Sequence, residues 1–188
     1  MEMSRDEIIN LLKELGLKEN IIKHVIAVEE LSLETAKLIL KNNPDMEIDL
    51  KLLSDGALLH DIGRSFTHSI NHAVEGVKIA KKYGFDDRIL RIIENHIGAG
   101  ITLEEAKGLN LPIKDYIPCS IEEKIVANAD NLLAGDKKRD IIVLYNKLVK
   151  MDNQEAADRV IVLYNEILGL MGQNESKRHS NAVSIQNL

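Results

Sequence analysis

The chain has 188 residues, a length that suggests one domain with a full-sized core. Its net charge of −6 argues against binding to duplex nucleic acid, because such proteins usually carry a basic face. No apolar stretch approaches the roughly 20 residues that span a bilayer, and the first residues form no signal region, so no membrane partner is expected. Cys119 is the only cysteine, which excludes an intrachain disulfide and favours a cytoplasmic location.

Hydrophobic residues recur every three or four positions along most of the chain, and no segment shows sustained alternation. Aromatic residues make up only 3% of the chain, so aliphatic side chains must fill the core, which favours packed helices. In the first half, the spacing and the residues at its ends predict helices over residues 4–16, 20–40, 49–62, 71–82 and 86–97. The third of these is nearly all apolar near its end and is expected to be central and buried.

The second half continues the helical pattern after a loop at 63–70. A short helix is predicted from Thr102, an extended link over 111–118, and a helix from the capping box at Ser120 to Gly135. Two amphipathic helices follow at about 137–150 and 153–170. We therefore expect an all-α bundle of about six to eight helices in a single domain, residues 1–171, with no strand. Residues 172–188 have no periodicity and are expected to form a disordered tail.

His60 and Asp61 lie together at the end of the most apolar helix, in Ala-Leu-Leu-His-Asp-Ile-Gly. Burying an ionised aspartate is costly unless a partner offsets its charge, and a metal ion is one such partner. Adjacent helical positions differ by about 100° in direction, so both side chains can approach one ion. The alternative is a helix end at which Asp61 only pairs with Arg64.

Two further polar residues lie in apolar helices. Asp130 is crowded by Ala127, Ala129 and Leu132, and His24 is set among isoleucine and valine. Either residue alone is compatible with a solvated face or with a satisfied core position. Together with His60 and Asp61 they invite a shared explanation.

Taken in order, His24, His60-Asp61 and Asp130 form the H…HD…D pattern, and the chain resembles the HD-domain superfamily in this respect. The Ile62-Gly63 that follows makes it the HDIG variant. The resemblance covers roughly residues 18–135 and is nearest to archaeal HDIG proteins of unassigned substrate. It implies a helical HD-domain bundle and a metal-dependent phosphohydrolase.

His72 and His96 resemble the additional ligands of the two-metal HD subgroup, which includes the symmetrical diadenosine tetraphosphate hydrolases. If Asp61 bridges two ions, then His24, His60 and Asp130 complete one site, and His72 and His96 the other. Four histidines and two carboxylates suit iron, manganese, zinc, nickel or cobalt better than magnesium or calcium. The loop before His72 is shorter than in the diadenosine group, and the stretch from His96 to Asp130 is longer, so the substrate cannot be carried over.

Such a site can use a metal-activated hydroxide to cleave a phosphoester or phosphoanhydride of a nucleotide or similar small phosphorylated metabolite. Asp61 would then be catalytic as well as a ligand. Arg64 could bind a phosphate through its fork of donors, and His68 could protonate the leaving oxygen. A surface or Asp-paired arginine and a loop histidine without a role are equally compatible with the sequence.

Two other functions stay open. Some HD-domain proteins with the two additional histidines resemble mixed-valent di-iron oxygenases, whose ligand set is nearly the same. A regulatory module that binds a nucleotide without cleaving it is the third reading, although all six candidate ligands are present. The sequence is also compatible with a homodimer.

Overall fold

A computed structural model describes residues 3–172 of the chain. These residues form nine α-helices, one 3₁₀ turn and a two-stranded hairpin. The helices are α1 (Arg5–Glu14), α2 (Glu19–Asn42), α3 (Leu50–Leu59), α4 (His72–Lys82), α5 (Asp87–Asn95), α6 (Leu103–Gly108), α7 (Ile121–Asn131), α8 (Ile141–Lys150) and α9 (Gln154–Leu170). The 3₁₀ turn is η1 (Ile62–Ser65), and the strands are β1 (Leu133–Ala134) and β2 (Lys137–Lys138).

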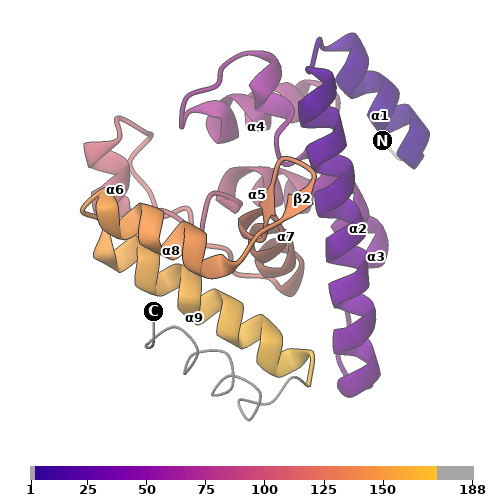
Figure 1. Ribbon diagram of the computed structural model, residues 1–188. Helices are drawn as coiled ribbons and strands as arrows, with labels where there is room; N and C mark the ends of the chain where they lie inside the picture. The colour runs from indigo at the N-terminus through magenta and orange to yellow at the C-terminus, as the bar shows by residue number, and fades with distance from the viewer. Residues whose placement is uncertain (1–2, 173–188) are drawn as a thin grey trace.

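The all-helical class expected from the sequence is confirmed (Figure 1). The described residues hold nine helices against an expected six to eight, and each lies in a segment for which the sequence predicts a helix, including the short α6 capped by Thr102. Side-chain caps begin several helices where the sequence predicts them. Ser4 and Glu7 form the capping box of α1, and Ser120 caps α7.

The long helix α2 runs along one side of the molecule, and α8 and α9 form an antiparallel pair on the other (Figure 1). Helices α5 and α7 lie between them and pack against α3, while α4 packs on α5 and η1. As expected, α3 is central: Leu53, Ala57, Leu58 and Leu59 are completely buried. Burial of this aliphatic layer holds fixed the C-terminal end of α3, where His60 and Asp61 follow.

The expectation of no strand is wrong for the four residues of the hairpin. The helix predicted to reach Gly135 ends at Asn131, and the helix predicted from 137 begins only at Ile141. Between them, β1 and β2 pair through a two-residue turn in which Gly135 has a φ of +64°. A glycine at the first central position suits a tight hairpin turn, because it takes a positive φ without steric cost.

Two further expectations concern the loop at 63–70 and the C-terminal tail. Part of the loop predicted at 63–70 is the 3₁₀ turn η1, in which the amide of Phe66 donates to the carbonyl of Gly63. The tail was predicted over residues 172–188, and all of it except Gly172 lies outside the described residues. Within residues 3–172, no helix is long and apolar enough to cross a membrane.

Candidate metal centre

Six side chains predicted from the sequence meet at one place in the bundle. His24 comes from α2 and Asp130 from α7, while His60 and Asp61 follow the last residue of α3. The last two are His72, which begins α4, and His96, which follows α5. The cluster therefore ties together segments that lie far apart in the sequence.

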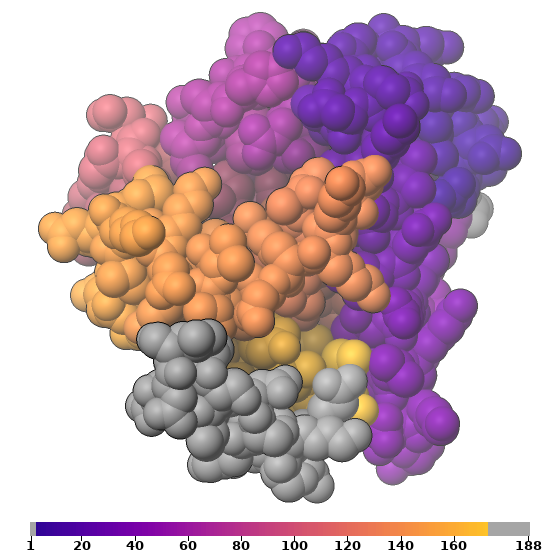
Figure 2. Space-filling view, in the orientation of Figure 1, coloured from indigo at the N-terminus to yellow at the C-terminus, as the bar shows by residue number. Residues whose placement is uncertain are grey.

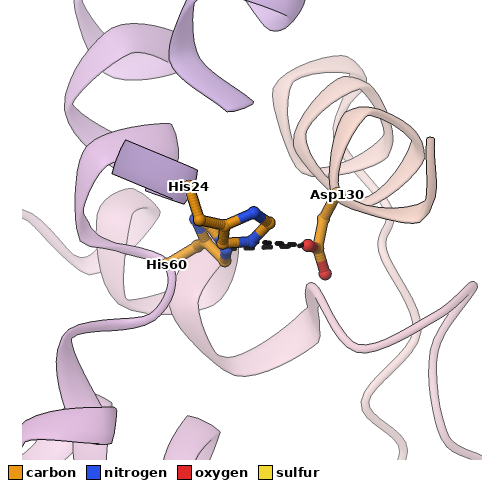
Figure 3. Close-up of side chains that lie close together, drawn as sticks. All are labelled: His24, His60 and Asp130. Carbon is orange, nitrogen blue, oxygen red and sulfur yellow. Dashed lines mark ion pairs between the residues drawn. The ribbon is translucent and has the colours of Figure 1, made fainter. Parts of the chain in front are cut away.

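One part of the cluster joins α2, α3 and α7. The His24 Nε2 atom lies 3.0 Å from Asp130 Oδ1, and His60 Nε2 lies 3.9 Å from the same oxygen. Figure 3 shows the two imidazole rings pointing from their helices toward the Asp130 carboxylate. The ligand atoms of these three residues all lie within 4.8 Å of one another, which is close enough to surround one metal ion.

The other part is built on Asp61. Its Oδ1 atom lies 3.2 Å from His72 Nε2 and 3.6 Å from His96 Nε2, and the two Nε2 atoms are 3.1 Å apart. Its Oδ2 atom faces the first part, 4.0 Å from His24 Nε2 and 3.9 Å from His60 Nε2. The Asp61 carboxylate thus lies between two groups of histidines, with one oxygen directed to each.

All four imidazole rings are held in the same way, because each Nδ1 atom hydrogen-bonds a backbone carbonyl. His60, His72 and His96 each donate to the residue three positions earlier, at 2.7–2.8 Å, whereas His24 donates to Gly135 in the hairpin at 2.8 Å. A carbonyl oxygen can only accept, so the proton of the neutral ring lies on Nδ1. Each Nε2 lone pair therefore points into the cluster, where it can bind a metal ion, and its direction is fixed from behind.

Within the described residues 3–172, two buried atoms of the cluster have no hydrogen-bond partner: His60 Nε2 and Asp61 Oδ1. Both residues are almost fully buried, at 0% and 4% exposure. Unsatisfied polar atoms at such depth cost free energy, and a cation that accepts electron pairs from both offsets that cost. The residues present fit a divalent metal, and imidazole nitrogens with carboxylate oxygens suit iron, manganese, zinc, nickel or cobalt.

The electrostatics of the cluster agree with this reading. Burial lowers the pKa of His60 to about 4, so its ring stays neutral near pH 7. Burial alone would raise the pKa of Asp61, but His60, His72 and His96 hold it well below its usual value. Burial would also raise the pKa of Asp130, but the His24 hydrogen bond and the nearby His60 and His96 together lower it. Both carboxylates are therefore ionised at neutral pH, as metal ligands must be.

Arg64 lies at the edge of the cluster. Its Nε atom donates to Asp61 Oδ2 at 2.7 Å, so the Asp–Arg pair considered from the sequence is present beside the histidines. One terminal nitrogen lies 3.3 Å from His72 Nε2. The side chain of His68 is exposed and does not join the cluster, although its backbone carbonyl lies 3.5 Å from Arg64.

A cavity of about 430 Å³ opens beside the cluster, lined by residues that include Asp61, Arg64 and His68. Four residues of its wall were not identified as site residues from the sequence: Lys18, Asn20, Ile21 and Gly135. In the space-filling view, the hairpin that carries Gly135 (orange) abuts α2 (violet), with the η1–α4 region (magenta) above it (Figure 2). In the sequence, Gly135 looks like a residue that ends a helix, and Lys18 belongs to no motif that would identify it.

Fold and centre together define an all-helical protein with a histidine–aspartate cluster that can bind metal. The family model of the HD domain matches residues 13–135, and the chain belongs to this family. HD domains are metal-dependent hydrolases and bind divalent metals, so the match agrees with the cluster. No solved structure matches the chain.

The chain is also similar to several known proteins. It is 45% identical to an uncharacterized protein of Methanocaldococcus jannaschii, over 90% of this chain and 99% of that one. It is 43% identical to a tRNA (cytidine(56)-2'-O)-methyltransferase of Picrophilus torridus, over 90% of this chain but only 48% of the relative. It is 29% identical to ribonuclease Y of Frankia casuarinae, over 81% of this chain but only 21% of that protein.

Proposed function

We propose that the chain is a metal-dependent phosphohydrolase that cleaves a phosphoester or phosphoanhydride of a nucleotide or similar small phosphorylated metabolite. The observation that carries the proposal is the set of four Nε2 atoms held toward the Asp61 carboxylate by four backbone carbonyls. A cluster that served only to fill the core would not need every imidazole oriented from behind. The family of metal-dependent hydrolases to which the chain belongs supports the same reading.

In this proposal, His24, His60 and Asp130 would hold one ion, His72 and His96 would hold a second, and Asp61 would serve both. Its two oxygens are directed to the two groups of histidines, which suits a bridging carboxylate. His60 also lies within reach of the Asp61–His96 group, so it is the ligand that can serve either ion. Two such ions, when bound, supply an acidified water as nucleophile and offset negative charge on the phosphoryl oxygens.

The residues at the cavity supply the remaining chemistry of the proposed reaction. Arg64 binds Asp61 through Nε, which leaves its terminal nitrogens at the edge of the cluster, where they can donate to a phosphoryl oxygen. His68 lines the same cavity and is free to approach the leaving group. In the proposed reaction, Arg64 orients the phosphate and His68 donates a proton to the departing oxygen.

An exposed aromatic ring supports a nucleotide rather than a simple phosphate. Phe66 lies between Arg64 and His68 on the same link, and 75% of its surface is exposed. Its neighbours Arg64 and His68 line the cavity, so an exposed ring on the same link is available to a partner there. A nucleobase that stacks on the ring is such a partner.

Two relatives favour a second candidate, an RNA phosphodiester as substrate. Ribonuclease Y carries a matching segment, and the tRNA methyltransferase of Picrophilus torridus contains one over about half its length. The net charge of −6 favours the small substrate, because long nucleic acids bind best to basic surfaces. The di-iron oxygenase and the regulatory nucleotide-binding module are the remaining alternatives.

A metal-dependent screen of phosphorylated substrates on the full chain tests the proposal, with bound metal measured in the same sample. The panel contains nucleotides, other phosphorylated metabolites and short oligoribonucleotides. Full turnover of a nucleotide with manganese under strict anaerobiosis is the expected result. Oxygen uptake coupled to product would replace the proposal with the oxygenase, and exclusive cleavage of oligoribonucleotides would replace it with the RNA phosphodiesterase.

A further inference from the structure

The cavity beside the metal centre is more basic than the protein that surrounds it. Lys18, Arg64 and His68 line it, and Asp61 is the carboxylate among its lining residues. Asp61 directs both oxygens to the histidines and Arg64, and its side chain is only 5% exposed. Although the chain has a net charge of −6, the mouth of this cavity is cationic, which suits an anionic ligand.

Lys18 is a cation of this mouth that has no carboxylate partner in the described part of the chain. Its side chain is exposed and makes no capping hydrogen bond, although the residue is the N-cap of α2. Within residues 3–172, its ammonium takes part in no ion pair. Arg64, by contrast, already donates to Asp61 at 2.7 Å. The ammonium of Lys18 is thus available to a ligand in the cavity without breaking another contact.

The position of Lys18 determines which part of a bound substrate its side chain can contact. It precedes His24 by six residues, which corresponds to about 9 Å along the axis of α2. The backbone of Lys18 therefore lies beyond His24 along the helix axis, at the wall of the cavity and not among the metal ligands. The positive end of the 24-residue helix α2 lies at the same point and adds to the attraction for an anion.

We propose that Lys18 is a substrate-binding residue that binds a second phosphate, adjacent to the phosphate that is cleaved. This inference rests on the proposed function and narrows its substrate class. The preferred substrates are phosphoanhydrides or phosphodiesters with a flanking phosphate, and not simple phosphate monoesters. Arg64 binds the phosphate at the metal centre, and Lys18 binds its neighbour across the cavity.

Two inert ligands that differ by one phosphonate group test the assignment: methylenediphosphonate and methylphosphonate. Their binding to the full chain is measured by isothermal titration calorimetry at one fixed Mn²⁺ concentration, so that chelation is equal for every variant. We expect Lys18→Met to weaken methylenediphosphonate about tenfold and methylphosphonate less than about twofold, as for loss of one charge-assisted hydrogen bond. Lys18→Arg should restore most of the affinity.

The matched control is Lys37→Met, because Lys37 is an exposed lysine of the same helix about 28 Å farther along its axis. It should bind both ligands as the wild type does, and melting temperatures should show that every variant is folded. A Lys18→Met variant that loses affinity for both ligands equally, or for neither, would overturn the proposal. So would a wild type that binds methylenediphosphonate no better than methylphosphonate.

Displacement of methylenediphosphonate identifies the source of the flanking phosphate, with a nucleoside diphosphate and a 5′-phosphorylated dinucleotide as competitors. Displacement by either that depends on Lys18 supports the proposal, and displacement by neither counts against it. Failure of the proposed function would give a different experimental result. In that case no phosphorylated substrate is hydrolysed with any metal, while the binding pattern of the two phosphonates and its dependence on Lys18 persist.

Discussion

The Cα atom of Gly63 packs directly against the backbone carbonyl of His72, with no room for a side chain between them. A Cβ atom at position 63 would overlap that carbonyl oxygen and approach the Gly76 amide nitrogen to 2.6 Å. The glycine of the HDIG sequence therefore lets η1 and the first turn of α4 approach closely. Since His72 is the first residue of α4, this approach sets where its imidazole lies relative to Asp61.

We predict that Gly63→Ala destabilises the fold by about 1–3 kcal/mol, as overpacking in a well-packed core does. It should also reduce bound metal, because α4 must move away and carry His72 with it. Gly169→Ala in α9 is the control, since its added Cβ meets no atom within 4 Å. Urea unfolding and metal analysis check both variants, and a fully stable Gly63→Ala protein would disprove the packing argument.

The hairpin should matter to the metal centre through one hydrogen bond, from His24 Nδ1 to the Gly135 carbonyl. Gly135 has a φ of +64°, so Gly135→Val should cost about 1–2 kcal/mol and distort the turn. Gly84→Val is a matched control, with the same kind of strain at a φ of +72°. Both should lower the melting temperature, but only Gly135→Val should weaken metal affinity, as competition with a chelator would show.

Much of the centre can be predicted from the sequence because its ligands follow local rules. His60, Asp61 and Asp130 stand out as polar residues in apolar helices, and the order of the motif places His24 with them. The hairpin could not be predicted, since strands of two residues have no periodicity to detect. Lys18 was missed because its place at the cavity arises only when η1 and the hairpin fold beside the start of α2.

The stretch between His96 and Asp130 is held to the bundle by Glu105, whose carboxylate pairs with Arg159 of α9 at 2.5 Å. Burial would raise the pKa of Glu105, but the hydrogen bonds from Arg159 and Thr102 and the Arg159 charge together lower it below its usual value of 4.5. The stabilisation is therefore present above about pH 4.5 and is lost as the pH falls through the lower folded pKa.

Glu105→Gln should destabilise the fold by about 1–3 kcal/mol at pH 7, because the partly buried Arg159 loses its carboxylate partner and keeps only the Gly100 carbonyl. The difference from wild type should shrink below pH 4.5, where protonation removes the charge in both proteins. Glu104→Gln on the same helix should change stability by less than about 0.5 kcal/mol, since its side chain is 78% exposed. Equal effects of the two variants at pH 7 would refute the role of the Glu105–Arg159 pair.

The Arg64→Ala variant should distinguish effects on substrate binding from effects on metal binding. Arg64→Ala removes the guanidinium beside Asp61 but none of the six proposed ligands, so the protein should retain its metal. Loss of a charge-assisted hydrogen bond to phosphate should lower kcat/KM by an amount equivalent to about 1.5–3 kcal/mol. Steady-state kinetics together with metal analysis test this. A variant that loses its metal would show that Arg64 is needed to assemble the centre.

The most direct test of the metal centre is the metal content of Asp61→Ala, measured by mass spectrometry beside the wild type, with melting temperatures to confirm folding. If the Asp61 carboxylate bridges the two histidine groups, the variant should bind less metal per chain and lose all turnover. Asp61→Asn should behave similarly, because it keeps the shape but loses the charge. If Asp61 merely pairs with Arg64, both variants will be less stable and their metal content will equal that of the wild type, which would contradict the account.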